Sequence, residues 1–284
     1  MSYWLVQILN GVSFGVLLFL LSAGLSLIFG LMRIINLAHG SFYLLGAYVG
    51  IAIMGMTGSF WLALAFAPVA VALISIVLHR FLLNHVVGNE LGQVLMTFGI
   101  LLIISDVSLW LWGGAPLMLE KPLVFEGSVN LAGATYPLYR LVITGAGLMA
   151  ALGLWLLIER TRVGAIVRAS VDDHEMVQGI GINLPLMTSL VFALGALLAG
   201  LSGVLAGPIL GVYPGADFVV VLLAFAVVII GGLGSLKGAF WGSLFVGLVD
   251  NFGKTMIPEF AMFTIFVPMA VVLAVRPTGI FGKA

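Results

Sequence analysis

Phe218-Val-Val-Val-Leu-Leu-Ala-Phe-Ala-Val-Val-Ile-Ile230 is an unbroken apolar run, and it decides the fold class. The strands of a membrane β-barrel would alternate apolar and polar residues over about ten positions, and this run does not alternate. A helix needs about 20 apolar residues to cross a hydrocarbon core roughly 30 Å thick. Apolar runs recur along the whole chain, so we expect an all-α integral membrane protein.

The composition excludes a water-soluble domain. Of the 284 residues, 62% are hydrophobic and 8% are charged, and the mean hydropathy is +1.27. Soluble domains run at roughly 45–50% apolar and about 25% charged residues. Eleven basic and eleven acidic residues leave no net charge to attract nucleic acid. The absence of cysteine excludes disulfides, a thiolate nucleophile and a cysteine metal site.

Nine apolar segments predict a single transmembrane domain over residues 1–284, a polytopic helical bundle of about 8–9 spans. They are Leu5–Gly30, Ser41–Met56, Phe60–Leu78, Val94–Trp112, Leu138–Ile158, Leu186–Gly207, Phe218–Leu233, Ala239–Val249 and Phe260–Val275. The second, seventh and eighth segments are short for full spans. We therefore expect half-helices or re-entrant pieces there, which are tolerated where the backbone is buried in protein or faces water.

Basic residues predict the orientation, because lysine and arginine concentrate in cytoplasmic loops. If all nine segments cross and the N-terminus lies outside, eight basic residues face the cytoplasm. Only Lys121, Arg140 and Lys254 then face the outside. We expect the N-terminus outside and the C-terminus inside.

A shift of 176 positions reveals a weak internal repeat. It places Leu25-Ser26 on Leu201-Ser202 and Phe42 on Phe218, and the turn at His39-Gly40 falls beside Pro214-Gly215. The first four spans then correspond to the last four, five spans later. Because five is odd, the two copies would have opposite topology, as in inverted-repeat transporters.

The sequence lacks the motifs of an enzyme. Gly231-Gly-Leu-Gly-Ser-Leu-Lys-Gly238 is no phosphate loop, because that loop needs Gly-Lys-Ser/Thr. The four histidines have no metal-binding spacing, and His79 and His85 read most simply as interfacial residues of a cytoplasmic loop. We expect no catalytic residues, no metal and no cofactor.

Polar residues at membrane depth are the candidates for a solute path, since their insertion is costly. Asp106 serves either helix packing or transport, and Ser41 either caps the second segment or lines the path. The short second and seventh segments begin near His39-Gly40-Ser41 and Gly215-Ala216-Asp217, and such segments in two repeats point to a transporter site. The candidate path residues are Asn36, His39, Gly40, Ser41, Tyr43, Asp106 and Asp217.

The longest polar stretch, residues 159–185, falls in the cytoplasm. Asp172 to Gln178 fits a short helix with acids in its first turn, ended by Gly179 and Gly181. The stretch is either a solvated connector or a docking surface for a cytoplasmic partner.

Three motifs resemble a known family. Asn36-Leu-Ala-His-Gly-Ser-Phe-Tyr-Leu-Leu-Gly-Ala-Tyr48 and Arg168-Ala-Ser-Val-Asp-Asp-His-Glu175, the latter followed by Gly181-Ile-Asn183, are similar to signatures of LivH-like permease subunits of bacterial branched-chain amino acid ABC importers. The block Val227-Val-Ile-Ile-Gly-Gly-Leu-Gly-Ser-Leu-Lys-Gly-Ala-Phe-Trp-Gly242 matches the wider permease family. Met176 departs from the family, which more usually has alanine there.

The resemblance implies a five-part importer in the bacterial inner membrane. Its partners would be a second, related permease subunit or a second copy of this chain, two cytoplasmic ABC ATPases and a periplasmic solute-binding protein. ATP hydrolysis would take place in the separate ATPase chains. The stretch 159–185 would couple to an ATPase through Arg168, Asp172, Asp173, Glu175, Gly181, Ile182 and Asn183.

The resemblance leaves the solute open. Branched-chain amino acids suit a mostly apolar path, while similar relatives carry urea or short amides. A stand-alone secondary transporter or channel, in which Asp106 or His39 moves protons, is the alternative from another class.

Overall fold

Helices make up most of the structure, a computed structural model that describes residues 2–32, 34–131, 133–172, 174–179, 181–261 and 263–282. The α-helices are α1 (Ser2–Met32), α2 (His39–Thr57), α3 (Phe60–Phe81), α4 (Glu90–Trp112), α5 (Leu138–Arg160), α6 (Arg162–Asp172), α7 (His174–Gly179), α8 (Leu184–Leu210), α9 (Ala216–Gly231), α10 (Leu236–Met256) and α11 (Phe263–Val275). Short 3₁₀ turns are η1 (Leu83–Val86), η2 (Leu123–Phe125) and η3 (Pro258–Phe260), and the strands are β1 (Ser128–Leu131) and β2 (Ala134–Pro137). The chain is an all-α polytopic membrane protein with one small hairpin.

Each of the nine predicted segments corresponds to a helix, although α9 ends at Gly231, before the predicted Leu233, and α11 begins at Phe263, after the predicted Phe260. Six of the described helices are long and apolar enough to cross a membrane, or seven spans result if the bent pair α9 and α10 counts as one. That pair is bent by 118°, and α11 has 13 residues. Helix α10 runs to Met256, beyond the predicted end at Val249, because its polar residues find partners: Asn251 Nδ2 donates to Gln7 Oε1 of α1 (2.8 Å).

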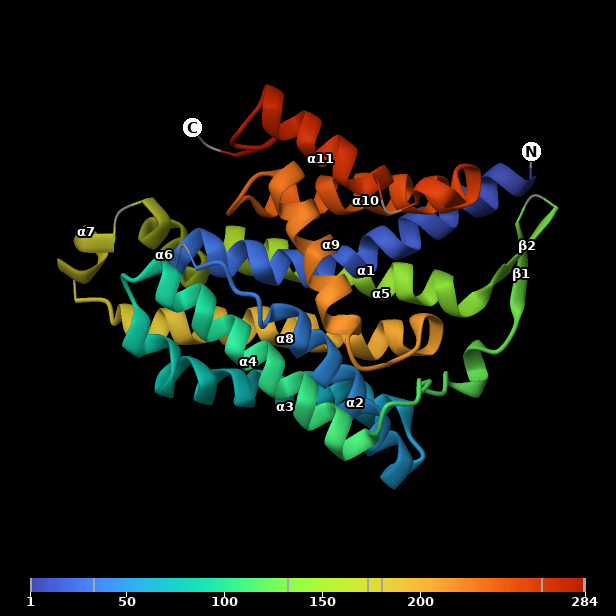
Figure 1. Cartoon of the computed structure of the whole chain (residues 1–284), viewed down its shortest axis with the longest axis horizontal. Coiled ribbons are helices and arrows are strands. Elements are labelled where there is room, and N and C mark those ends of the chain that lie inside the picture. The colour runs from blue at the N-terminus through green and yellow to red at the C-terminus, as the bar shows by residue number, and fades with distance from the viewer. Residues whose placement is uncertain are drawn as a thin grey trace.

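Helices α1 and α8 form the centre of the bundle. In each, 78% of the most apolar 18-residue window is buried, against 22% for α5 at the periphery. Ser202 of α8 donates to the carbonyl of Leu17 on α1 (2.9 Å), so a polar group is satisfied where the two helices cross. Figure 1 shows α6 and α7 at one end of the molecule, with the N-terminus, β1 and β2 at the opposite end.

The β-hairpin was not predicted from the sequence. Its antiparallel strands pair Ser128 with Pro137 and Leu131 with Ala134. Tyr136 of β2 is buried, and its hydroxyl lies 3.0 Å from Ser13 Oγ on α1. Alternate residues of β2 therefore pack against the helical bundle, which explains why so short a hairpin is held in place.

The helix bounds repeat with the 176-residue shift seen in the sequence. Adding 176 to the bounds of α3 gives 236–257, against 236–256 for α10. The same operation on α2 gives 215–233, against 216–231 for α9. Contacts follow the same rule: α1 packs on α10 as α8 packs on α3, and α2 packs on α3 as α9 packs on α10.

The turns before α3 and α10 are also equivalent. Ser59 caps α3 by accepting a hydrogen bond from Leu62 N (3.5 Å), and Ser235, 176 residues later, caps α10 through Gly238 N (3.0 Å). The residues before these caps, Gly58 and Gly234, both have positive φ (66° and 76°). Two halves of the chain therefore build the same turn from the same residue types.

Candidate functional site

The connector between α1 and α2 is buried inside the protein. Thr97 of α4 holds it: its hydroxyl accepts from Leu37 N (3.3 Å) and lies 3.3 Å from Ile35 O, to which it donates. Asn36 is fully buried, and neither polar atom of its side chain has a hydrogen-bond partner among the described residues. Irregular backbone is tolerated at membrane depth only when it is enclosed in this way or lines water.

His39 joins the start of α2 to the middle of α1. Its ring is fully buried, and Nε2 lies 2.9 Å from the carbonyl oxygen of Leu21. The ring also packs edge-on against Phe42, which in turn packs against Phe192 of α8. His39 therefore holds the first turn of α2 against both central helices.

Ser41 and Asp217 join the two halves of the chain at the first turns of α2 and α9. Ser41 Oγ donates to Asp217 Oδ2 (3.0 Å), and both residues are buried. They are 176 residues apart, so they occupy equivalent positions in the two halves. Gly40 allows the close crossing, because a Cβ there would collide with the carbonyl oxygen of Asp217. Figure 1 shows α9 crossing the bundle between α10 and α8.

A cleft of about 180 Å³ opens beside this crossing, between α1, α2, α8, α9 and α10. Its walls are mainly apolar, with Leu17 and Leu21 of α1 facing Val220 of α9. A water molecule needs at least about 10–15 Å³ of such space, so the cleft has room for several waters or a small solute. Apolar walls with few polar groups are typical of binding sites for small molecules.

The polar residues of the cleft are few. Tyr43, Tyr213 and Ser202 line it with hydroxyl-bearing side chains, and Lys254 is the one charged residue in its lining. Of the residues predicted for a solute path, only Tyr43 lines the cleft. No local pattern in the sequence marks Lys254 as a cleft residue, because Phe14, its partner across the cleft, lies 240 positions earlier.

The predicted path residues are brought together except for one. Asn36 lies on the buried connector, and the first turns of α2 hold His39, Gly40, Ser41 and Tyr43. Ser41 bonds Asp217 of α9, and Gly40 packs against the main chain of Asp217. Asp106 is exposed on α4, and among the described residues no hydrogen bond links it to this group. The structure therefore places Ser41 and Asp217 in a buried contact between the starts of α2 and α9. The Asp106 carboxylate lies apart from them, on the outside of the bundle.

His79 lies elsewhere than expected. It is fully buried in the last turn of α3, not exposed in a loop, and its Nδ1 lies 3.1 Å from Ser189 Oγ of α8. Its ring packs 5.1 Å from that of Phe192. The prediction that His79 lies in a loop is wrong, because α3 continues past this residue and packs closely on α8.

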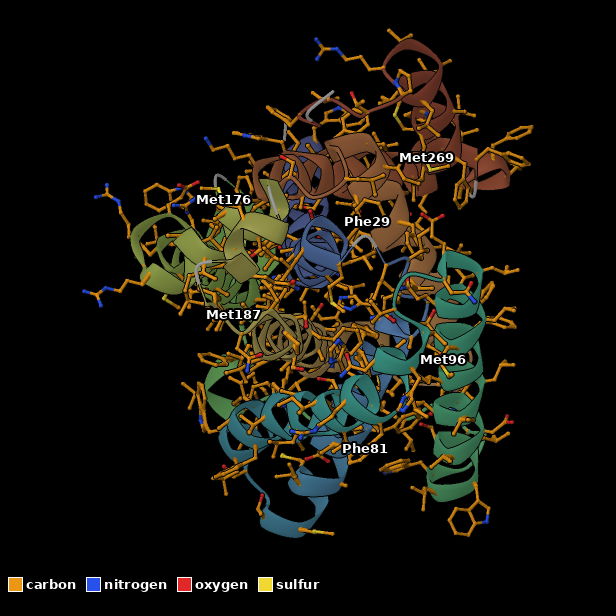
Figure 2. The ribbon with its side chains drawn as sticks, turned by 90° about the vertical axis from the view of Figure 1, so that its left-hand side faces the viewer. Phe29, Phe81, Met96, Met176, Met187 and Met269 are labelled. Carbon is orange, nitrogen blue, oxygen red and sulfur yellow. The ribbon has the colours of Figure 1, made fainter. Side chains whose placement is uncertain are left out.

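The stretch 159–185 folds into two short helices. Thr161 caps α6 by accepting from Gly164 N (3.1 Å), and Arg168 of α6 reaches back to the end of α5, where it bonds Ile158 O and pairs with Glu159 (3.4 Å). The expected helix over 172–178 corresponds to α7, which starts at His174. Figure 2 looks at the molecule from this end, with Met176 of α7 on one side of Phe29 of α1 and Met96 of α4 on the other.

The residues predicted for coupling to an ATPase occupy this pair of helices and the turn after it. Asp172 ends α6 and Glu175 lies in α7, while Asp173 lies outside the described residues. Gly181 has a positive φ of 85°, which lets the chain turn after α7. Ile182 N bonds Val177 O (3.3 Å), and Asn183 caps α8 by accepting from Leu186 N (3.1 Å). Arg168 and Asn183 therefore have structural partners within this chain.

No group of three or more His, Cys, Asp or Glu residues suited to a metal ion occurs in the described part of the chain. What the structure does present is a bundle of helices long and apolar enough to cross a membrane, with a small cleft between its two equivalent halves and a pair of short helices at one end. These features define a multi-spanning membrane protein.

The chain belongs to a family whose description is branched-chain amino acid transport system / permease component, and the match covers residues 7–275. It is 29% identical over 300 residues to the high-affinity branched-chain amino acid transport system permease protein BraD of Pseudomonas aeruginosa, covering 99% of this chain and 96% of that protein. It is 30% identical over 302 residues to LivH of Escherichia coli K12, with the same coverage.

A more distant relative and a solved structure are also similar to this chain. The probable branched-chain amino acid transport permease protein LivH of Methanocaldococcus jannaschii is 25% identical over 285 residues, covering 94% of this chain and 89% of that protein. The structure of PsaBC from Streptococcus pneumoniae in complex with Fab matches with a TM-score of 0.50 at 15% identity, covering 94% of this chain and 89% of that one. This second likeness concerns the fold alone.

Proposed function

We propose that this chain is the membrane-spanning permease subunit of an ATP-driven importer that carries branched-chain amino acids across the bacterial inner membrane by alternating access. The observation that carries the proposal is the family match over residues 7–275, together with relatives named as branched-chain amino acid permeases. Its partners are a second permease subunit, related or identical, two cytoplasmic ABC ATPases and a periplasmic solute-binding protein. Residues 1–284 form one transmembrane permease domain, of which the stretch 159–185 lies in the cytoplasm.

The two equivalent halves of the chain form an inverted repeat in this proposal, with the N-terminus outside. The equivalent bounds of α3 and α10, and the equivalent caps Ser59 and Ser235, support the repeat. Short helices that start at corresponding positions of two repeats favour a site at the repeat interface. The first turns of α2 and α9, joined by Ser41 and Asp217, stand at that interface.

The stretch 159–185 is the coupling loop in this proposal. Exposed positions Gln178 and Gly179 on α7 are available to an ATPase surface, and α6 is fixed to α5 through Arg168. ATP binding then biases the permease pair between inward-open and outward-open states. Moving a 1:99 equilibrium to 99:1 takes about 10⁴-fold preference, or about 5.5 kcal/mol, and closure of an ATPase pair is the source of that bias.

The test is co-purification of the tagged chain followed by identification of its partners. We expect two ATPase subunits, a second permease and a binding protein, and the reconstituted complex should couple ATP hydrolysis to leucine uptake. The isolated chain should neither bind nor hydrolyse ATP. Saturable nucleotide binding by the isolated chain, or amino acid uptake driven by a proton gradient without ATPases, would overturn the proposal.

Tyr43 gives a sharper test of the solute path. Tyr43→Trp enlarges a side chain that lines the cleft, so uptake should fall or its solute preference should change. Assembly and basal ATP hydrolysis should survive. If assembly falls in step with uptake, Tyr43 has a packing role and the path lies elsewhere.

A further inference from the structure

We propose that Lys254 binds the carboxylate of the transported amino acid at the cleft, while the apolar walls hold the aliphatic side chain. The proposal rests on the proposed function and names a residue that determines its solute class. Lys254 is the one charged residue lining the cleft, and in the proposed orientation it lies in the last turn of α10, near the outer surface.

The ammonium group of Lys254 is fixed at the wall of the cleft. Its Nζ lies 2.7 Å from Asp250 Oδ2, one helical turn earlier, and 5.5 Å from the centre of the Phe14 ring. The Asp250 side chain is 7% exposed, whereas that of Lys254 is 59% exposed. A lysine ammonium carries three donors, and Asp250 is its one hydrogen-bond partner among the described residues. Donors therefore remain for a second acceptor.

Asp250 does not line the cleft, so its part is to hold the ammonium group of Lys254 at the wall. The carboxylate of a free amino acid meets Lys254. Leu17, Leu21 and Val220 offer apolar surface to the side chain.

This chemistry separates amino acids from neutral solutes. Hydrogen bonds between an ammonium and a carboxylate are roughly twice as strong as those between neutral groups. Urea and short amides bear no carboxylate, so Lys254 gives them no such advantage. The cleft therefore favours a small aliphatic solute that carries a carboxylate.

Uptake by the reconstituted complex provides the first test. Lys254→Met removes the charge while keeping an unbranched side chain, and it should lower leucine uptake by at least about tenfold, the loss expected for one hydrogen bond to a charged group. Lys254→Arg keeps the charge and should retain most of the uptake. The matched control is Lys121→Met, which removes a positive charge from an exposed residue that does not line the cleft. Leucine uptake unchanged in Lys254→Met would overturn the proposal.

A labelling experiment tests binding at the cleft without transport. The chain has no cysteine, so Leu210→Cys places a single thiol on an exposed residue of the cleft lining. Millimolar leucine should slow maleimide labelling of this thiol, whereas leucinol, which lacks the carboxylate, should not. The protection should vanish when Lys254→Met is added and persist with Lys254→Arg. Equal protection by leucine and leucinol, or protection that survives Lys254→Met, would contradict the role of Lys254.

The two tests fail in different ways. An intact complex that carries no amino acid refutes the proposed function, and the labelling result still decides whether Lys254 recognises a carboxylate. A complex that imports leucine equally well with Lys254→Met leaves the proposed function standing and removes Lys254 from it.

Discussion

Ser41 and Asp217 are the residues that join the first turns of α2 and α9 by a hydrogen bond. Their hydrogen bond of 3.0 Å is buried, so water does not compete for either partner. Asp217 Oδ1 has no partner among the described residues, which leaves Ser41 as the side-chain donor that the carboxyl group relies on. A buried polar group deprived of its partner costs about 1–3 kcal/mol.

We predict strong coupling between these residues in a double-mutant cycle. Ser41→Ala and Asp217→Ala should each destabilise the purified chain. The double variant should lose less stability than the sum of the losses in the two single variants. The expected coupling is about 0.5–3 kcal/mol, the range for residues in contact, measured by thermal unfolding in detergent. Ser41→Ala with Thr57→Ala is the control, because the Thr57 hydroxyl bonds Ile53 O at the far end of α2. Additive effects for Ser41 and Asp217 would show that the bond contributes nothing.

Gly40 supports a second prediction at this scale. In Gly40→Ala the new methyl group meets the main chain of Asp217 and the Cβ of Val221, neither of which can rotate away. Overpacking of this kind typically costs about 1–3 kcal/mol. Gly55→Ala, in the same helix with nothing within 4 Å of the added Cβ, should be neutral or slightly stabilising. Comparing the melting temperatures of the two variants checks this, and equal temperatures would contradict the close crossing of α2 and α9.

At the scale of elements, α7 and the turn after it are expected to transmit the action of an ATPase. Gly181 has a φ of 85°, a conformation that is strained for any residue with a side chain. Gly181→Leu should therefore displace α7 from α8 and abolish transport, while the chain still accumulates in the membrane. Uptake and ATP hydrolysis by the same vesicles measure whether coupling is lost.

Gly58→Leu is the matched control for this substitution. Gly58 also has a positive φ (66°) and open space around it, but it ends α2 on the outer side of the membrane in the predicted orientation. Gly58→Leu should lower the stability of the chain about as much as Gly181→Leu does. ATP hydrolysis should nevertheless stay coupled to uptake. If Gly58→Leu uncouples the transporter as severely, backbone strain in general is responsible, and α7 has no special role.

The local sequence predicted the positions of the helices well, but it did not predict which distant residues contact one another. The nine apolar segments all became helices because a lipid environment forces each apolar run to satisfy its own backbone hydrogen bonds. The end of α10 was placed too early, at Val249, because Asp250 and Lys254 resemble the residues that follow a span. Their ion pair and the bond from Asn251 to Gln7 let the helix continue.

Partners distant in sequence explain the rest of the site. His79 looked like a loop residue, and only the packing of α3 on α8 shows that Ser189 and Phe192 enclose it. The first turns of α2 and α9 were predicted as a site from their shortness, but the bond between Ser41 and Asp217 depends on how the halves pack. The cleft was not predicted at all, since its walls come from five helices.

At the scale of the whole molecule, the arrangement across the membrane follows from counting helices between two points. A single predicted span, α5, separates Leu123 from Gln178, so we expect these residues to face opposite sides of the bilayer. Basic residues predict that Gln178 is cytoplasmic and Leu123 is outside. Leu123 is 80% exposed and Gln178 is exposed as well, so a thiol at either position is accessible to a reagent on its own side.

Because the natural chain has no cysteine, single substitutions report each side without background. A membrane-impermeant maleimide should label Leu123→Cys in right-side-out vesicles and leave Gln178→Cys unlabelled, and inverted vesicles should reverse the result. Met149→Cys is the control: it is 70% exposed in the middle of α5, where lipid excludes a charged reagent, so it should stay unlabelled in both preparations. Labelling of Gln178→Cys from outside would contradict the predicted orientation. It would also remove the coupling role of α7, because an ATPase acts only in the cytoplasm.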